Sequence, residues 1–150
     1  MNYYEYALKQ KEDNPEIEIF GGVEIGIIKS VENKLSIIFP DEYVKFLLEC
    51  GSCGYPDSYI SGLFQKWDNL SSTGSTLHDT LNAREIHNLP NDFIVLEYKV
   101  DENYYVMKVS DNERLKDSEV YSVDIDTNGN LTVYNKIFNS FGEYFIFILE

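Results

Sequence analysis

Apolar residues in the first third of the chain recur at the three- and four-residue spacing of α-helices. After Glu24, Ile27, Val31 and Leu35 repeat every four residues, and Ile28 widens the same stripe. A stripe of this kind favours a helix that buries one face.

A second helix is predicted to begin at Phe39-Pro40-Asp41-Glu42. Proline suits the first helical position, because the N–H that it lacks would have no partner there. Asp41 and Glu42 add negative charge to the first turn, where the helix dipole favours it. Gly51 is expected just past the end as a left-handed cap. The apolar stripe is predicted to consist of Val44, Leu47 and Leu48, broadened by Tyr43 and Phe46.

The segments on either side of these helices have weaker patterns. The first dozen residues predict a short helix that ends at Asn14-Pro15, and residues 16–22 predict a short strand or an extended lead-in. YPDSYISGLF, residues 55–64, predicts a short extended segment with several aromatic residues.

The polar segment SSTGST, residues 71–76, is expected to be a loop. Leu77, Leu81 and Ile86 follow it at helical spacing. This helix must stop near Pro90, because the residue before a proline disfavours α-helical geometry.

After Pro90 the helical spacing gives way to the patterns of β-strands. FIVLEY, residues 93–98, is a continuous apolar run with β-branched residues. In NYYVMKV, residues 103–109, Tyr105 and Met107 face one way and their neighbours face the other. EVYSVDID, residues 119–126, has apolar residues on one face and acids on the other. Both segments alternate as half-buried strands do.

The last part of the chain predicts a hairpin and a helix. Asn128-Gly129 favours a tight turn, after which LTVYN returns as a strand. Ser140 and Glu143 form a capping box before an apolar run, which predicts a C-terminal helix. Runs of helices and runs of strands with short links indicate an α+β fold. We therefore predict a single domain over residues 1–150, with a mostly antiparallel central sheet and helices packed around it.

The charge balance limits the classes of partner. Asp and Glu number 26 against 12 Lys and Arg, which gives a net charge of −14. Such a surface repels nucleic acid and anionic lipid and attracts cations or a basic protein. Acidity of this degree also keeps a protein soluble, with no partner involved. The first residues lack the basic start and apolar run of a signal peptide, so a cytoplasmic protein is expected.

Two cysteines, Cys50 and Cys53, have the spacing of a redox or metal motif. A redox pair places its first thiol at a helix N-terminus, where the dipole stabilises the thiolate. Here the first cysteine falls at the C-terminal end of the predicted helix. Zinc would need further ligands, and His78 and His87 do not have ligand spacing. We interpret both cysteines as structural and expect no metal or cofactor.

Asp124-Ile-Asp126-Thr-Asn128-Gly129 matches the first half of a calcium loop. The twelfth position, however, is Asn135 rather than the bidentate glutamate. Strands, not helices, are predicted on both sides, and a hairpin turn alone explains the Asn-Gly pair. A calcium-dependent module remains a minor alternative.

No sequence motif supports an enzyme. The chain has no phosphate-binding glycine loop and no recognisable Ser/His/Asp arrangement, and 26 acids produce chance carboxylate pairs everywhere. Tyrosine is abundant, with 12 residues, several of them beside acids. Tyrosine is enriched at protein interfaces, although many of these residues are expected to lie in the core or half-buried in strands.

The segments VEIGIIKSVENKLSI and FPDEYVKFLLECGSCG together resemble the N-terminal core of the SUKH superfamily. The resemblance covers about residues 23–149, and residues 1–22 form an added helix and lead-in. Phe39 replaces the usual leucine, and the two cysteines lie inside the glycine-rich stop. The positions that match the family's motif, which we expect to be structural, are Pro40, Tyr43, Phe46, Leu47, Gly51, Gly54, Gly62 and Leu63.

The resemblance implies a binding protein with no shared catalytic residues. Many bacterial members are immunity proteins that neutralise a toxin, often a nuclease, whereas eukaryotic members are scaffolds that regulate cell-wall synthesis. The sequence therefore predicts an immunity protein that occludes a basic toxin, and a non-enzymatic scaffold or regulator is the alternative. The predicted contact residues are Tyr55, Asp57, Tyr59, Asp101, Glu102, Tyr104, Asp111 and Glu113.

Overall fold

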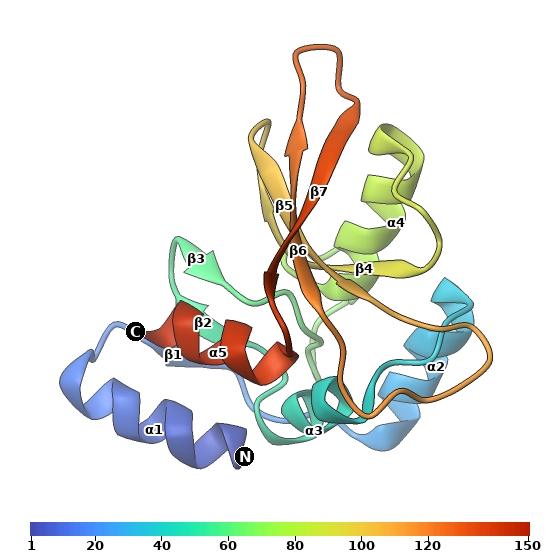
Figure 1. The fold of residues 1–150 in the computed structure, drawn as a ribbon. Coiled ribbons are helices and arrows are strands. Elements are labelled where there is room, and N and C mark those ends of the chain that lie inside the picture. The colour runs from blue at the N-terminus through green and yellow to red at the C-terminus, as the bar shows by residue number, and fades with distance from the viewer.

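The computed structural model describes residues 1–150 and contains five helices and two antiparallel sheets (Figure 1). The α+β class predicted from the sequence is therefore confirmed. The elements in chain order are α1 (Tyr3–Asp13), β1 (Glu18–Ile19), α2 (Ile25–Leu35), α3 (Asp41–Glu49), β2 (Cys53–Tyr55), β3 (Ser58–Tyr59), α4 (Thr76–His87), β4 (Phe93–Lys99), β5 (Asn103–Lys108), β6 (Val120–Ile125), β7 (Leu131–Phe138) and α5 (Phe141–Leu149).

The larger sheet has the strand order β4-β5-β6-β7, with every pair antiparallel. Apolar side chains cover both of its faces. Val95, Tyr104 and Val106 pack with Ala83 of α4, whereas Ile94 and Met107 belong to the main core. The predicted alternation of β5 is thus confirmed. Figure 1 shows α4 beside this sheet and the β6–β7 hairpin extending beyond the other elements.

The smaller sheet joins β1, β2 and β3 in that order. Its hairpin depends on Gly54, which has a φ of +149° and pairs with Tyr59. A Cβ at this glycine would lie 2.4 Å from the Cα of Tyr59, so no side chain fits without displacing the backbone. This close approach fixes the β2–β3 turn, in which Asp57 lies.

Helix α3 forms the centre of the main core. It begins at Asp41, with Pro40 at the N-cap, one residue later than a proline at the first helical position would require. Tyr43, Phe46 and Leu47 are buried, and Val44 packs partly buried against the core, as the sequence predicted. Leu48 is the exception, because its side chain is 43% exposed. The buried aromatic rings pack against those of α1 and α5.

The helix ends follow the predicted capping chemistry. Gly51 has a φ of +68° just past α3, as a left-handed cap requires. Ser140 Oγ accepts the N–H of Glu143 at 3.1 Å, and the Glu143 carboxylate accepts the N–H of Asn139 at 2.9 Å, one residue before the usual capping-box partner. Each bond satisfies a backbone donor at the start of α5.

Three predicted boundaries or faces need correction. Thr76 belongs to α4 rather than to the preceding loop, because Ser75 caps the helix through an Oγ contact with the N–H of His78. Ile86 is 57% exposed and does not face the core. Strand β7 continues to Phe138, beyond the predicted LTVYN segment.

Candidate functional site

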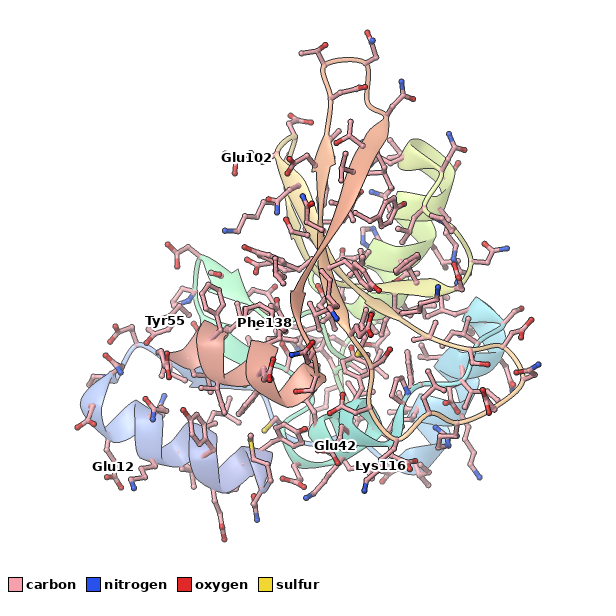
Figure 2. The ribbon with its side chains drawn as sticks, viewed as in Figure 1. Glu12, Glu42, Tyr55, Glu102, Lys116 and Phe138 are labelled. Atoms are coloured by element: carbon pink, nitrogen blue, oxygen red, sulfur yellow. The ribbon has the colours of Figure 1, made fainter.

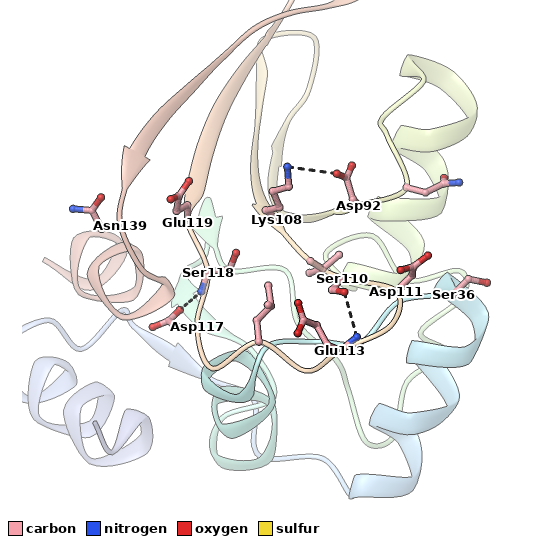
Figure 3. A pocket seen from close by; sticks show the side chains of 13 residues that line it. Ser36, Asp92, Lys108, Ser110, Asp111, Glu113, Asp117, Ser118, Glu119 and Asn139 are labelled. Atoms are coloured by element: carbon pink, nitrogen blue, oxygen red, sulfur yellow. Dashed lines mark hydrogen bonds and ion pairs between the residues drawn. The ribbon is translucent and has the colours of Figure 1, made fainter.

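A cleft with a volume of about 870 Å³ opens between the β5–β6 connection, the segment just before β4 and Asn139, which follows β7 (Figure 3). Its only apolar lining residues are Val109 and Leu115. We call it the acidic cleft, because five carboxylates and one lysine line it: Asp92, Asp111, Glu113, Asp117, Glu119 and Lys108.

Arg114 fixes the connection that carries most of these acids. Its guanidinium donates to Glu32 Oε2 at 2.9 Å and to the carbonyl of Phe39 at 2.8 Å. Backbone bonds add to this clamp, since Asp41 N–H donates to the carbonyl of Leu115 and Ile38 pairs with Ser110. The loop is therefore held against α2 and α3, where its residues line the cleft.

A second arginine supports the opposite rim of the cleft. Arg84 of α4 donates to the carbonyl of Leu35 at 2.9 Å and to the carbonyl of Asn91 at 3.1 Å. Its Nε is buried without a partner, and burial lowers the pKa of its guanidinium. These bonds tie the end of α2 to the segment that positions Asp92.

Few cations compensate the carboxylates of the cleft. Lys108 lies 3.6 Å from Asp92, and Lys136 lies 3.9 Å from Glu119, both at exposed positions where ion pairs are weak. Burial raises the pKa of Asp117, although the N–H groups of Phe141 and Ser118 donate to this carboxyl group and partly oppose the shift. The cleft therefore keeps excess negative charge.

The structure divides the predicted contact residues into two groups. Asp111 and Glu113 line the acidic cleft. Asp57 and Tyr59 line a different, smaller pocket, which also includes Val100, next to Asp101 and Glu102 in the β4–β5 turn. Tyr55 is half-buried and donates from its hydroxyl to the carbonyl of Leu149 at 3.3 Å. Figure 2 shows Glu102 in the upper part of the molecule and Tyr55 at the left, both away from Lys116 at the base.

The prediction that Tyr104 is a contact residue is wrong. Its side chain is 0% exposed, and its hydroxyl lies 2.7 Å from His87 Nδ1 in the second core cluster. Burial raises the pKa of this tyrosine. The sequence pattern misled because the acids at 101 and 102 suggested a surface, whereas α4 covers this face of β5.

Cys50 and Cys53 are free thiols buried in the main core. Cys50 caps the C-terminal end of α3, as the sequence predicted. A hydrogen bond with Cys50 and burial both raise the pKa of Cys53. Because the thiolate is the reactive and metal-binding form, both features oppose redox chemistry and metal binding at this pair.

The half-matched calcium segment forms a hairpin turn. Asp126 Oδ1 accepts the N–H groups of Asn128 and Asn130, each at 2.9 Å, and Gly129 has a φ of +80°. The Asp126 carboxylate is thus used by the turn itself. No group of three or more His, Cys, Asp and Glu side chains in the structure could hold a metal ion.

Residues that match the SUKH motif join the end of α3 to the segment after β3, in which Ser61 lines the smaller pocket. The N–H of Leu63 donates to the carbonyl of Gly51 at 3.0 Å, and a Cβ at Gly62 would lie 1.8 Å from that same oxygen. Tyr43 donates from its hydroxyl to the carbonyl of Ser61 at 2.7 Å. The motif therefore encodes close backbone packing between the end of α3 and the segment after β3.

Sequence reasoning missed several surface residues. Asp92, Asp117 and Glu119 join the cleft only because the fold brings together segments far apart in sequence. Trp67 is 54% exposed although it packs 4.5 Å from Phe64 between ring centroids. It is the single tryptophan of the chain, and this alone could have drawn attention to it.

The fold and the cleft define an α+β protein with an acidic surface hollow. A family model described as the SMI1 / KNR4 family (SUKH-1) matches residues 22–146. The match spans most of the chain, so the chain belongs to this family, and the resemblance seen in the sequence is confirmed. No curated protein matched the chain. The family includes toxin immunity proteins and SMI1/KNR4 regulators, and its members act through protein–protein interaction. No helix has both the length and the apolar character needed to cross a bilayer.

Proposed function

We propose that this protein is a cytoplasmic immunity protein that binds a basic bacterial toxin of the nuclease type and occludes its active surface. The acidic cleft carries this proposal, because five carboxylates and one lysine line a single hollow. Family membership adds support, since immunity proteins are one of the two kinds of member named above.

The physical argument rests on charge complementarity. An enzyme that binds nucleic acid presents Lys and Arg to phosphates, so its substrate groove attracts other polyanions. A protein with a net charge of −14 would be steered to that groove, with an association rate raised by tenfold or more at low salt. Occlusion of the groove would then stop the toxin without any catalytic step by the immunity protein.

Co-expression with a candidate toxin, sought in the gene next to this one, tests the proposal. Cells that carry the toxin should survive only when this protein is present. Replacement of Asp92, Asp111, Glu113 and Glu119 by their amides should abolish protection, because it removes most of the cleft's charge. Death of the cells although this protein is present, or binding that is insensitive to salt, would refute the mechanism.

A matched control variant distinguishes the effect of the cleft carboxylates from the effect of the protein's net charge. Glu5, Glu12, Asp13 and Glu16 are exposed in or near α1, away from the cleft, as Figure 2 shows for Glu12. Their replacement by amides changes the net charge by the same amount. Protection should persist in this control variant if the cleft is the contact surface, and should fall equally in both variants if only net charge matters.

A scaffold that regulates a cellular enzyme is the second candidate, because the family also includes SMI1/KNR4 regulators. Affinity capture from the native cells distinguishes the two. A toxin as the captured partner supports the immunity role, whereas a biosynthetic enzyme together with the lack of a neighbouring toxin gene supports the regulator.

A further inference from the structure

A small pocket lies apart from the acidic cleft, between the β2–β3 turn, the loop before α4 and the end of β4. We call it the side pocket. Its volume is about 150 Å³, well below the roughly 300–1,000 Å³ of pockets that enclose a whole small-molecule ligand. A pocket of this volume can accommodate one side chain of a protein partner. The lining residues on which the argument depends are Asp57, Tyr59, Asp79, Glu97 and Tyr98.

Two of these carboxylates are almost fully buried. Asp79 is 5% exposed and Glu97 is 6% exposed. Glu97 accepts hydrogen bonds from Ser58 Oγ at 2.9 Å and from the Tyr144 hydroxyl at 3.4 Å, and burial raises its pKa. The charge of Lys99 lowers the pKa of Glu97 by less than burial raises it, and the two side chains form no ion pair, because Lys99 Nζ lies over the ring of Tyr105.

Asp79 is held in a similar way at the start of α4. It accepts a hydrogen bond from Ser61 Oγ at 2.8 Å, and His78 Nδ1 lies 3.2 Å away. Neither Asp79 nor Glu97 forms an ion pair with a lysine or an arginine of this chain. Buried carboxylates are normally paired with a cation. Here the only basic side chain within ion-pair distance of either is His78, which does not line the pocket, so no lysine or arginine neutralises the two carboxylates.

The walls of the pocket are aromatic and fixed in place. Tyr59 lies against Gly74, where a Cβ would be 2.2 Å from the tyrosine hydroxyl. Tyr98 stacks on Tyr104 with ring centroids 4.5 Å apart. Tyrosine faces attract lysine and arginine head groups, and their apolar area accommodates the carbon stems of these side chains.

We propose that the side pocket binds one lysine or arginine side chain of a protein partner. Its charged head group faces Asp79 and Glu97, and its stem packs against Tyr59 and Tyr98. Asp57 is an exposed residue of the pocket lining, and its carboxylate attracts the incoming cation. The identification of the partner as the basic toxin rests on the proposed function, whereas recognition of a basic side chain is a property of this pocket alone.

An NMR titration tests the pocket without a toxin. The probes are the blocked tripeptides Gly-Arg-Gly and Gly-Lys-Gly, with Gly-Gln-Gly as the neutral control. The basic peptides should shift the amide signals of Ser58, Gly74 and Glu97, and the neutral peptide should not. Glu97→Gln should weaken binding about tenfold or more, whereas Asp111→Asn in the acidic cleft, with the same charge change, should leave it unaltered.

Several outcomes would overturn the inference. The first is an equal shift of the amide signals with all three peptides, and the second is a shift confined to the amide signals of Asp92 and Asp111. The third is an unchanged affinity of the folded Glu97→Gln variant for the basic peptides. Tyr59→Leu is a second variant that keeps both buried carboxylates, and it should weaken binding several-fold through the lost aromatic face. Peptide binding without toxin neutralisation would support the side pocket as a site for a basic side chain and refute the immunity role. Toxin neutralisation without peptide binding would support the immunity role and refute the side pocket as such a site.

Discussion

At the residue scale, Glu97 should limit the stability of the free protein at neutral pH. Burial raises its pKa in the folded state, so the folded protein binds the proton more tightly than the unfolded chain does. The free energy of unfolding therefore falls as pH rises from the unfolded pKa towards the raised folded pKa. Glu97→Gln should raise Tm at pH 7 by a few degrees, and the gain should shrink towards pH 4.

Thermal unfolding of both proteins between pH 4 and pH 8 measures this effect. Glu102→Gln removes an exposed carboxylate in the β4–β5 turn and serves as the control. A gain in Tm that is independent of pH, or one that is equal in the control, would show that ionisation of Glu97 is not the cause.

The Tyr104–His87 bond is a second residue-scale test. Tyr104→Phe should remove the 2.7 Å contact and leave buried His87 Nδ1 without its partner. An unsatisfied buried group costs about 1–3 kcal/mol, which corresponds to a fall in Tm of roughly 2–10 °C. The toxin neutralisation proposed above should persist in this variant, because Tyr104 is inaccessible.

Calorimetry and the co-expression assay together check both parts of this prediction. Tyr55→Phe is the matched control, since its hydroxyl makes only a 3.3 Å bond at a half-buried position. If Tyr104→Phe lost protection while its Tm stayed normal, this tyrosine would be a contact residue after all.

At the element scale, the β5–β6 connection depends on Arg114. Arg114→Ala should leave Glu32, which is 7% exposed, without its cation and release the carbonyl of Phe39. We expect a loss of about 1–3 kcal/mol and faster amide hydrogen exchange over residues 110–118. Lys136→Gln, which breaks only the exposed pair with Glu119, should change neither quantity appreciably. Unchanged exchange in Arg114→Ala would mean that backbone bonds alone hold the connection.

The sequence predicted elements best where local chemistry determines them. Gly51, the Asn128-Gly129 turn and the Ser140 cap each act within a few residues, and each lies where the pattern placed it. Strands β1 and β3 have two residues each, and both lie in segments predicted to be extended. The bounds of β1 could not be predicted locally, because it pairs with β2, which is far away along the chain. On α3 the burial centres on Tyr43 and Phe46, which α1 and α5 cover, whereas Leu48 is exposed, and spacing within the helix could not rank these positions.

At the scale of the whole molecule, the composition showed that the chain is acidic, but it did not show where the acidic side chains gather in the fold. Asp111 and Glu113 are close in sequence and lie together in the cleft, which local reasoning could suggest. Asp92 and Glu119 join them only through the pairing of β4, β5 and β6. The side pocket depends even more on tertiary packing, because it brings Asp79 of α4 together with Glu97 of β4.

The net charge of −14 also predicts a response to salt that needs no partner. Self-repulsion destabilises the compact state, and about 0.15 M salt screens charges beyond about 8 Å. Raising NaCl from about 0.02 to 0.3 M at pH 7 should therefore raise Tm. Magnesium and calcium at equal ionic strength should act alike, because Asp126 already caps its own turn. A stabilisation specific to calcium would instead revive the calcium module, and a Tm that fell or stayed constant in NaCl would show that the carboxylates do not repel one another enough to matter.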